Sequence, residues 1–540
     1  MNEGNRSTKT DLKSQLGTFG LPSTWSSTLF PFDNGVKGRF EAEAANLNVY
    51  GEIPKELNGT FYRIMVDPFY PLQEGNPPIE GDGNICAFRI QDGQVDMKTR
   101  YVDTDRLRLE RRANKRLFGL YRNPFSHHPC VRSAVDSTAN TNLVFWAGKL
   151  VALKESALPY EIEPNSLETL SYDPFVSPGK TFTAHPKADP YSDELVVFGY
   201  EAKGLLTDDI VIYALDKQGK IHDEQWIKSP WVAFIHDCAI TTNFVILVLW
   251  PYEANQDPLK EIDQHWNYSR DLKATVIVVP RRHSGKRPAG WKVGEHRVYS
   301  WDHALLLHTA GAWEEWSGEV GNSQVKLKLE TSRMMYNPFP MFEKSPPAGE
   351  APDLSADYVR WTLDLSAPTG ARIPDPHVVL DMPSEMARID ERFLGREYNR
   401  IFCPVIIPNK ASPMPPILPP GLNGYVIVDR NDGEEQQTAL FDPGAGCTVE
   451  EPVFVPRSKD ATEGDGWVLG MVHRIDIDRS DVVILDTKHF ETPVAVVQLP
   501  FRTKSQVHGN WVDADATTEP LVRPWPEVKL RGRGALDPEN

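Results

Sequence analysis

A strand, a polar turn and a returning strand recur along this chain, and this pattern restricts the fold more than any other feature. It occurs in AFRIQDGQVDMKTRYVD, VIYALDKQGKIHDEQWI, WTLDLSAPTGARIPDPHVVLD and VVILDTKHFETPVAVVQLP. Hairpins repeated at irregular spacing are typical of β-propeller blades, of which roughly six to eight would fit at about 40–50 residues each. The sequence therefore predicts an all-β propeller, and the pattern alone leaves open a large sandwich or a two-domain β protein.

Short β-type runs dominate the chain, and amphipathic helices of ten or more residues are scarce. We expect a mobile polar tail over residues 1–17 and a single propeller domain over residues 18–540. The Pro-rich segments Lys344–Asp353 and Pro404–Leu422 are predicted to be long surface or lid loops.

Charge and hydropathy exclude several classes of protein. The net charge is −17, whereas binding to nucleic acid needs a basic surface. The longest apolar run, FVILVLW, is far shorter than the roughly 20 residues of a membrane span. The first residues lack the apolar core of a signal peptide, and the five cysteines are scattered without a CxxC motif. We expect a cytoplasmic protein with reduced thiols, no nucleic-acid partner and no transmembrane segment.

The stretch LLLHTAGAWEEW, from Leu305 to Trp316, carries a histidine into an apolar run with two acids, Glu314 and Glu315, close behind. HExxH, GxSxG and P-loop motifs are absent, so a site on the propeller axis would collect single ligands from distant blades. Four histidines stand in distinctive settings, namely His185, His236, His308 and His508. Ordinary core histidines are the alternative for each, and periodicity does not exclude the competing candidates His127, His128 and His303.

The four histidine settings resemble those of the carotenoid cleavage oxygenase family. Five further segments are similar to that family in the same order along the chain: Asn58–Pro68, Gly81–Phe88, Leu150–Thr169, Glu385–Tyr398 and Glu450–Arg457. The resemblance implies a seven-bladed propeller with a cap of loops and short helices. It also implies a non-haem Fe(II) ion on the axis, held by His185, His236, His308 and His508. Neutral imidazoles suit Fe(II) and leave positions open for O2.

The same resemblance places carboxylates behind three of the ligands, where they would accept the second ring N–H. Glu155 would serve His236, Glu385 would serve His308 and Glu451 would serve His508, which leaves His185 without an acid. Glu314 and Glu315 are then surface or loop-anchoring charges. One departure from the family is Gly311, where an Asn is usual, and it affects the expected loop geometry.

Within the family, substrates are carotenoids, apocarotenoids or phenolic stilbenes. Tyr121 and Lys154 occupy positions that resemble those at which stilbene-cleaving members hold a phenol. A lysine there could hydrogen-bond or deprotonate a para-hydroxyl and activate the double bond, whereas a carotenoid would only bury the ammonium at a cost. By resemblance, Phe61 would be an aromatic wall and Thr141 would lie near the vacant metal position. Strand alternation sets Lys154 and Glu155 on opposite faces unless the strand ends or bulges there.

The leading hypothesis is therefore an Fe(II)-dependent dioxygenase. It would cleave the central double bond of hydroxylated stilbenes such as resveratrol or piceatannol with O2, giving two aromatic aldehydes. The first alternative is a carotenoid or apocarotenoid oxygenase, which would make contact with a membrane surface. The second is a propeller that binds partners without catalysis.

Overall fold

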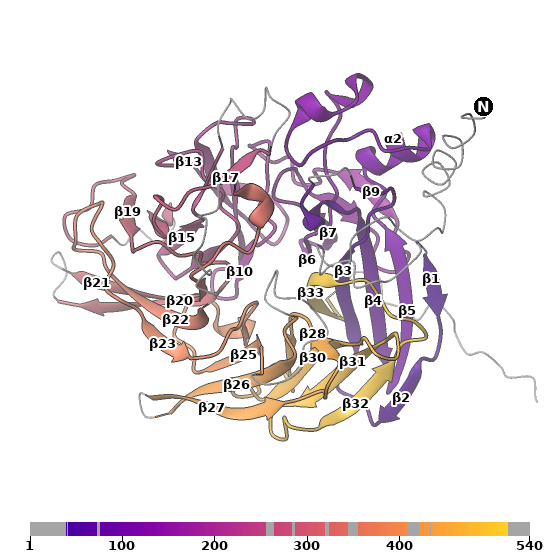
Figure 1. The fold of residues 1–540 in the computed structure, drawn as a ribbon. Helices are drawn as coiled ribbons and strands as arrows, with labels where there is room; N and C mark the ends of the chain where they lie inside the picture. The colour runs from indigo at the N-terminus through magenta and orange to yellow at the C-terminus, as the bar shows by residue number, and fades with distance from the viewer. Residues whose placement is uncertain are drawn as a thin grey trace, which may run out of the picture.

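The computed structural model describes residues 39, 41–72, 76–254, 264–282, 287–318, 323–343, 355–407, 421–431 and 434–516. Seven sheets lie in a ring (Figure 1), which confirms the propeller and excludes the sandwich. The predicted tail, residues 1–17, lies outside the described residues. So do residues 344–353 and 408–420 of the two Pro-rich segments.

The blades are antiparallel sheets that follow one another along the chain. Blade 1 consists of β1 (Ala42–Ala44), β3 (Gly59–Val66), β4 (Gly83–Gln91), β5 (Gln94–Tyr101) and β33 (Gln506–Asp513). Blade 2 consists of β6 (Asn142–Trp146), β7 (Lys149–Leu153), β8 (Tyr160–Ile162) and β9 (Thr169–Tyr172). Blade 3 consists of β10 (Lys187–Asp189), β11 (Glu194–Tyr200), β12 (Asp209–Leu215) and β13 (Ile221–Lys228). Blade 4 consists of β14 (Cys238–Ile240), β15 (Phe244–Leu249), β18 (Thr275–Pro280) and β19 (Arg297–Ser300).

The remaining blades complete the ring. Blade 5 consists of β20 (Thr309–Ser317), β21 (Gln324–Met334), β22 (Ala356–Asp364) and β23 (His377–Leu380). Blade 6 consists of β24 (Arg388–Ile389), β25 (Arg400–Val405), β26 (Gly424–Asn431) and β27 (Glu434–Phe441). Blade 7 consists of β2 (Asn48–Gly51), β28 (Cys447–Val449), β29 (Val453–Pro456), β30 (Gly466–Arg474), β31 (Arg479–Asp486) and β32 (Pro493–Gln498). A small hairpin projects from blade 4 and consists of β16 (Tyr252–Ala254) and β17 (Trp266–Tyr268).

The ring is closed twice. The late strand β33 pairs with β3 in blade 1, and the early strand β2 pairs with β32 in blade 7. A strand from the late part of the described chain therefore belongs to the first blade, and a strand from the early part belongs to the last blade.

The innermost strands touch their neighbours around the axis. Contacts run between β6 and β33, β10 and β14, β14 and β20, β20 and β24, β24 and β29, and β29 and β33. A residue at the start of any of these strands is therefore held close to the axis.

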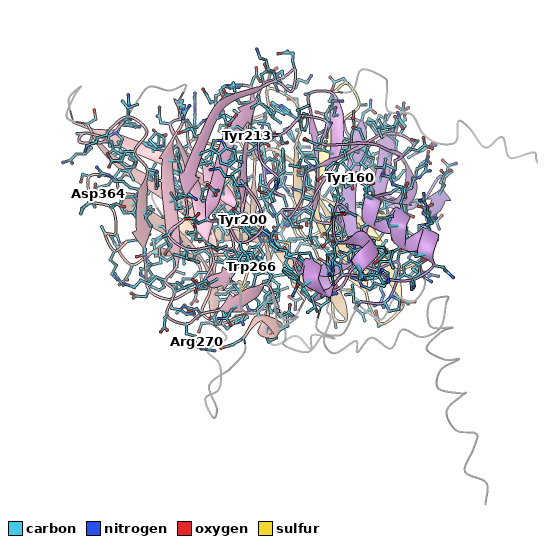
Figure 2. All side chains as sticks on the ribbon, turned by 90° about the horizontal axis from the view of Figure 1, so that it is seen from above. Tyr160, Tyr200, Tyr213, Trp266, Arg270 and Asp364 are labelled. Carbon is cyan, nitrogen blue, oxygen red and sulfur yellow. The ribbon has the colours of Figure 1, made fainter. Side chains whose placement is uncertain are left out.

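The sequence patterns explain the blades. In the β4–β5 hairpin the turn residues Asp92 and Gly93 both have positive φ, at 51° and 74°, as a tight hairpin requires. Strands with long apolar runs, such as β11 and β15, are buried on both faces because each blade packs between two others. Figure 2 shows side chains filling this space, with Tyr200 and Trp266 in the interior at a ring-centroid distance of 6.2 Å.

Short helices and loops cover one end of the ring. The described residues contain one α-helix, α2 (Asp105–Ala113), which Thr104 caps by accepting a hydrogen bond from the Leu107 N–H. The 3-10 turns η1 (Pro78–Glu80), η2 (Pro124–Ser126) and η3 (Pro129–Val131) lie in the same part of the chain. None of the described helices has the length and apolar character needed to cross a membrane.

Candidate metal centre

The four predicted histidines come together at the axis. His185, His236 and His308 each precede the innermost strand of a blade by one or two residues, at β10, β14 and β20, while His508 lies within β33. One ring nitrogen from each of the four lies within 4.8 Å of the other three. Four distant segments of sequence therefore supply one compact cluster.

The spacing of the ring nitrogens suits a single ion. Nε2 of His236 lies 3.1 Å from Nε2 of His185 and 3.0 Å from Nε2 of His308. Nitrogens bound to one divalent ion at about 2.1 Å and at right angles would lie about 3.0 Å apart.

Each predicted carboxylate stands behind its predicted histidine. Nδ1 of His236 lies 2.7 Å from Oε2 of Glu155, and Nδ1 of His508 lies 3.1 Å from Oε1 of Glu451. Nδ1 of His308 is hydrogen-bonded to Oε2 of Glu385.

These contacts determine which ring nitrogens face inward as lone pairs. A carboxylate accepts the Nδ1 proton, which leaves Nε2 of His236, His308 and His508 unprotonated. Nε2 of His508 is buried and has no hydrogen-bond partner among the described residues. Facing lone pairs at about 3 Å repel one another unless a cation lies between them. The residues therefore fit a divalent metal, and a cluster of imidazoles suits iron, zinc, copper or nickel.

The electrostatics favour neutral rings at His185 and His508 and ionised acids behind the other ring nitrogens. Burial lowers the pKa of His185 well below its usual range and that of His508 to about 4. Burial would also lower the pKa of His308, but the Glu385 carboxylate beside it outweighs that effect and raises the pKa. Although burial opposes ionisation, His236 lowers the pKa of Glu155, and Arg388 and His508 lower that of Glu451.

The competing histidines have other roles. His127 accepts a hydrogen bond from the Gly119 N–H and pairs with Asp136. His303 lies between the Leu272 carbonyl and the Tyr268 hydroxyl. A second grouping of possible metal ligands, centred on Glu194, is less suited to an ion because Glu194 already forms a 2.6 Å ion pair with Arg281.

Glu314 and Glu315 do not reach the cluster. Glu314 accepts hydrogen bonds of 2.6 Å from both the backbone N–H and the side-chain amide of Asn243, so it anchors the β14–β15 turn. Glu315 is half-exposed and faces Lys328 at 3.6 Å. Gly311 leaves room for a tyrosine, because a Cβ at this position would lie 2.6 Å from Cε1 of Tyr398.

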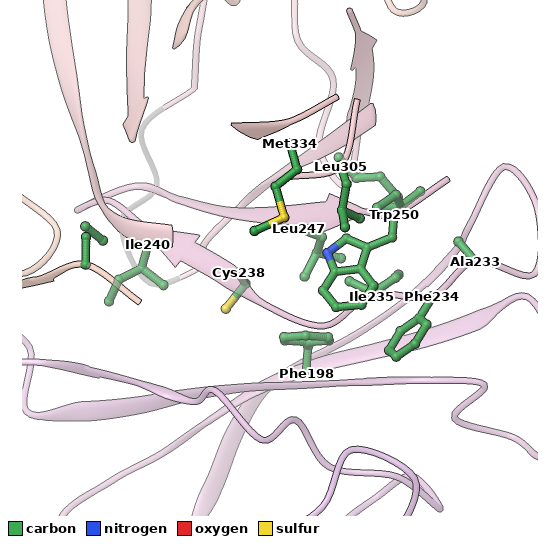
Figure 3. Close-up of a cluster of buried hydrophobic side chains, with 14 of the residues drawn as sticks. Phe198, Ala233, Phe234, Ile235, Cys238, Ile240, Leu247, Trp250, Leu305 and Met334 are labelled. Carbon is green, nitrogen blue, oxygen red and sulfur yellow. The ribbon is translucent and has the colours of Figure 1, made fainter. Parts of the chain in front are cut away.

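A cavity of about 190 Å3 lies against His236 and His308. Its apolar lining includes Phe234, Trp250 and Phe339, and Figure 3 shows Phe234 and Trp250 within the buried cluster of blades 3 to 5. Its polar lining includes Lys154, Glu155, Asn140 and Thr141, together with Thr448, Glu450, His473 and Gln506 from the last blades. An apolar ligand with a few polar groups would suit such a space.

Lys154 and Glu155 both line this cavity because the strand ends before them. β7 stops at Leu153, and the Ala157 N–H donates to the Lys154 carbonyl in the turn that follows. Alternation no longer applies there, which resolves the conflict raised by the sequence. Tyr121, the other residue predicted to hold a phenol, is not among the residues that line this cavity. It is buried, and its hydroxyl donates to Oε1 of Glu155 at 3.3 Å. Burial raises the pKa of Tyr121 well above its usual value, so the hydroxyl keeps its proton.

The prediction for Phe61 is wrong. Phe61 is fully buried in the core between blades 1 and 7, where it packs on Phe88 at a centroid distance of 6.1 Å, and it does not line the cavity. The physical reason is that β3 is not an innermost strand, so its side chains pack against neighbouring blades. Thr141 does line the cavity, at the beginning of blade 2.

Several supporting residues carried no recognisable signal in the sequence. Arg63 and Arg388 approach the Glu451 carboxylate at 3.7 and 3.2 Å. Asn140 and Glu80 approach Lys154 from loops that precede blade 2 and β4. Only Asp237 could have been suspected, because it directly follows His236, and it ties blade 4 to blade 5 through Thr309.

Comparisons with known proteins agree with this geometry. The family described as Retinal pigment epithelial membrane protein matches residues 35–513. Resveratrol cleavage oxygenase 1 of Botryotinia fuckeliana (strain B05.10) is 53% identical over 523 residues, which cover 96% of this chain and 92% of the relative. Isoeugenol monooxygenase of Pseudomonas nitroreducens is 38% identical over 487 residues, covering 88% and 96%.

A solved structure, that of the lignostilbene dioxygenase of Pseudomonas brassicacearum, is also similar. It superimposes with a TM-score of 0.80 at 33% identity, covering 88% of this chain and 96% of that one. With most of its length matched in sequence and in structure, the chain belongs to the carotenoid cleavage oxygenase family.

Proposed function

We propose that this protein is an Fe(II)-dependent dioxygenase that cleaves the central double bond of hydroxylated stilbenes. One O2 adds across the bond overall, so that each former olefin carbon leaves as the carbonyl of an aromatic aldehyde. The observation that carries the proposal is the shared cavity, in which the buried Lys154 and two histidines of the cluster, His236 and His308, line the same mostly apolar space.

The histidine cluster would hold the iron. His185, His236, His308 and His508 would be its ligands, and Glu155, Glu385 and Glu451 would orient three of the rings through Nδ1. Ferrous iron, when bound, would supply a centre that binds and activates O2. The aromatic walls formed by Phe234, Trp250 and Phe339 would exclude water from the double bond.

The chain's own polar residues would recognise a phenol. Nζ of Lys154 lies at the cavity wall, where an ammonium can donate a hydrogen bond to the phenolic oxygen. A phenol is neutral at pH 7, since its pKa is about 10, and a nearby cation favours its anionic form. Charge on that oxygen delocalises through the ring into the olefin, which becomes richer in electrons. Tyr121 would hold the Glu155 carboxylate in place through its hydroxyl hydrogen bond. Thr141 would line the cavity near the metal.

Three relatives support this choice of substrate class. Two of them are named for resveratrol and lignostilbene, and the third is named for isoeugenol, a phenol with a conjugated propenyl chain. The shared element is a hydroxyaryl group conjugated to a double bond, which is what a lysine at the cavity wall would select.

The test is a product assay. Iron-loaded protein is incubated with resveratrol, its 4′-O-methyl ether, isoeugenol and a β-apocarotenal, and products are identified by mass spectrometry. We expect 4-hydroxybenzaldehyde and 3,5-dihydroxybenzaldehyde from resveratrol and much slower cleavage of the ether. Equal cleavage of resveratrol and its ether would refute phenol recognition. Conversion of the apocarotenal alone would favour the carotenoid alternative. If the iron-loaded protein converts none of the four substrates, a non-catalytic propeller is favoured.

We also propose a cytoplasmic location, supported by five free cysteines of which four are buried. No nucleic-acid partner is proposed for a chain with a net charge of −17.

A further inference from the structure

The surroundings of the Lys154 ammonium contain an unused carboxylate oxygen. Nζ of Lys154 lies 3.3 Å from Oδ1 of Asn140 and 3.4 Å from the Ile79 carbonyl, both long for charge-assisted hydrogen bonds. The ammonium also forms an ion pair with Oε2 of Glu80, at 3.7 Å. Both side chains are almost completely buried, with 3% and 2% of their surface exposed.

The two oxygens of Glu80 have unequal partners. Oε1 is hydrogen-bonded to the Arg106 guanidinium, whereas Oε2 is buried with no hydrogen-bond partner among the described residues. An unsatisfied buried carboxylate oxygen is costly unless a nearby charge compensates it. Among the described residues, the Lys154 ammonium is the cation that forms an ion pair with Oε2 itself.

Arg106 fixes the Glu80 carboxylate in place. Its guanidinium also bonds Oδ1 of Asp136 at 2.7 Å and lies 5.2 Å from the centre of the Phe118 ring. Glu80 therefore bridges an anchored arginine and the lysine. Removing its charge would leave two buried cations without the anion between them, which is strongly unfavourable.

We propose that Glu80 is a positioning residue that holds the Lys154 side chain at the cavity wall, and thereby makes the enzyme selective for olefins that carry a free phenol. Glu80 does not line the cavity, so it acts through Lys154 and not on the substrate itself. The inference rests on the proposed function. Lys154 can turn from its long contacts with Asn140 and Ile79 to the phenolic oxygen while Glu80 remains close enough to balance its charge.

The first test compares Glu80→Gln with a matched control, Glu110→Gln. Glu110 is also a buried acid of the cap with one unpartnered oxygen, but it accepts hydrogen bonds from the Leu117 and Phe118 N–H groups and does not contact Lys154. We expect Glu80→Gln to lower kcat/KM for resveratrol about 10- to 100-fold, which is the effect of losing the charge-assisted hydrogen bond between Lys154 and the phenolic oxygen. Cleavage of the 4′-O-methyl ether and the iron content should not change. Glu110→Gln should not alter the ratio between the two substrates.

The second test is a double-mutant cycle with Lys154→Met. If Glu80 acts only through Lys154, Glu80→Gln has no further effect on resveratrol cleavage in the Lys154→Met background. Independent, additive losses would overturn the inference. Glu80→Asp, which keeps the charge, provides a second variant in case Glu80→Gln does not fold. It should retain most of the discrimination between resveratrol and the ether, and loss of discrimination would also count against the proposal.

A binding measurement separates this inference from the proposed function. 4-Hydroxystilbene is added to the iron-loaded protein without oxygen, and the absorbance of its phenolate is recorded. The phenolate fraction should be lower in Glu80→Gln than in wild type and unchanged in Glu110→Gln. If wild type cleaves no stilbene, the proposed function fails. If wild type cleaves resveratrol and Glu80→Gln matches it on both substrates, only the role of Glu80 fails.

Discussion

Glutamine in place of Glu451 or of Glu385 should weaken metal binding similarly but destabilise the metal-free protein to different degrees. Each acid accepts the Nδ1 proton of one histidine, at His508 and His308 respectively. Loss of such an outer partner costs about 10- to 100-fold in metal affinity, or about 1.4–2.7 kcal/mol. We expect this loss for both variants.

Their other partners differ in charge. Glu385 otherwise accepts from neutral donors, the Ser332 hydroxyl and the Met386 N–H, whereas Glu451 also faces the buried guanidiniums of Arg63 and Arg388. Breaking a buried ion pair from one side costs about 3–5 kcal/mol. Mismatching neutral hydrogen bonds costs about 1–3 kcal/mol. Glu451→Gln should therefore lower the free energy of unfolding about 2 kcal/mol more than Glu385→Gln.

Two assays on each purified variant separate these effects. Fe(II) affinity is measured anaerobically against a competing chelator, and urea unfolding is followed on metal-free protein. Equal free energies of unfolding for the two metal-free variants would show that the ion pairs of Glu451 with Arg63 and Arg388 add nothing to stability. An unchanged iron affinity in either variant would refute the orienting role of that carboxylate.

Three further predictions follow from individual contacts. His236→Ala should remove stoichiometric iron, measured by metal analysis, because this ring lies between those of His185 and His308; full retention of iron would contradict the proposed metal site. Gly311→Ala should destabilise the protein by about 1–3 kcal/mol in urea unfolding, because its Cβ would overlap the Tyr398 ring, and unchanged stability would mean that Tyr398 moves freely. Glu314→Gln should destabilise the Asn243 turn by about 1–3 kcal/mol with unchanged activity per bound iron, and an altered activity would tie Glu314 to the site after all.

The blades could be predicted because their signal is local. Runs such as ELVVFGY and DIVIYAL correspond residue for residue to β11 and β12, since strands packed between two blades need apolar side chains on both faces. The turn chemistry of Asp92–Gly93 is likewise readable without the structure.

The histidine cluster required more than periodicity. No spacing links His185 to His508, because a propeller brings them together only after its ring closes. The family motifs supplied that information, including the pairing of each acid with its ring. For Phe61 the family resemblance was misleading, since a position within a motif does not reveal whether its strand is innermost in the blade.

The cap was the least predictable part. Glu80 and Arg106 lie in loops and a short helix whose register with blade 2 depends on tertiary packing alone. Lys154 illustrates the same limit, since its orientation depends on β7 ending one residue earlier.

The double closure of the propeller has a consequence for biosynthesis. His508 lies on β33, which pairs with a strand laid down more than four hundred residues earlier. A nascent chain that has emerged only as far as blade 6 holds three of the four imidazoles and an open ring. A metal ion bound by all four imidazoles could therefore be held only after the last strand is made, and it would then help to join the two ends of the ring.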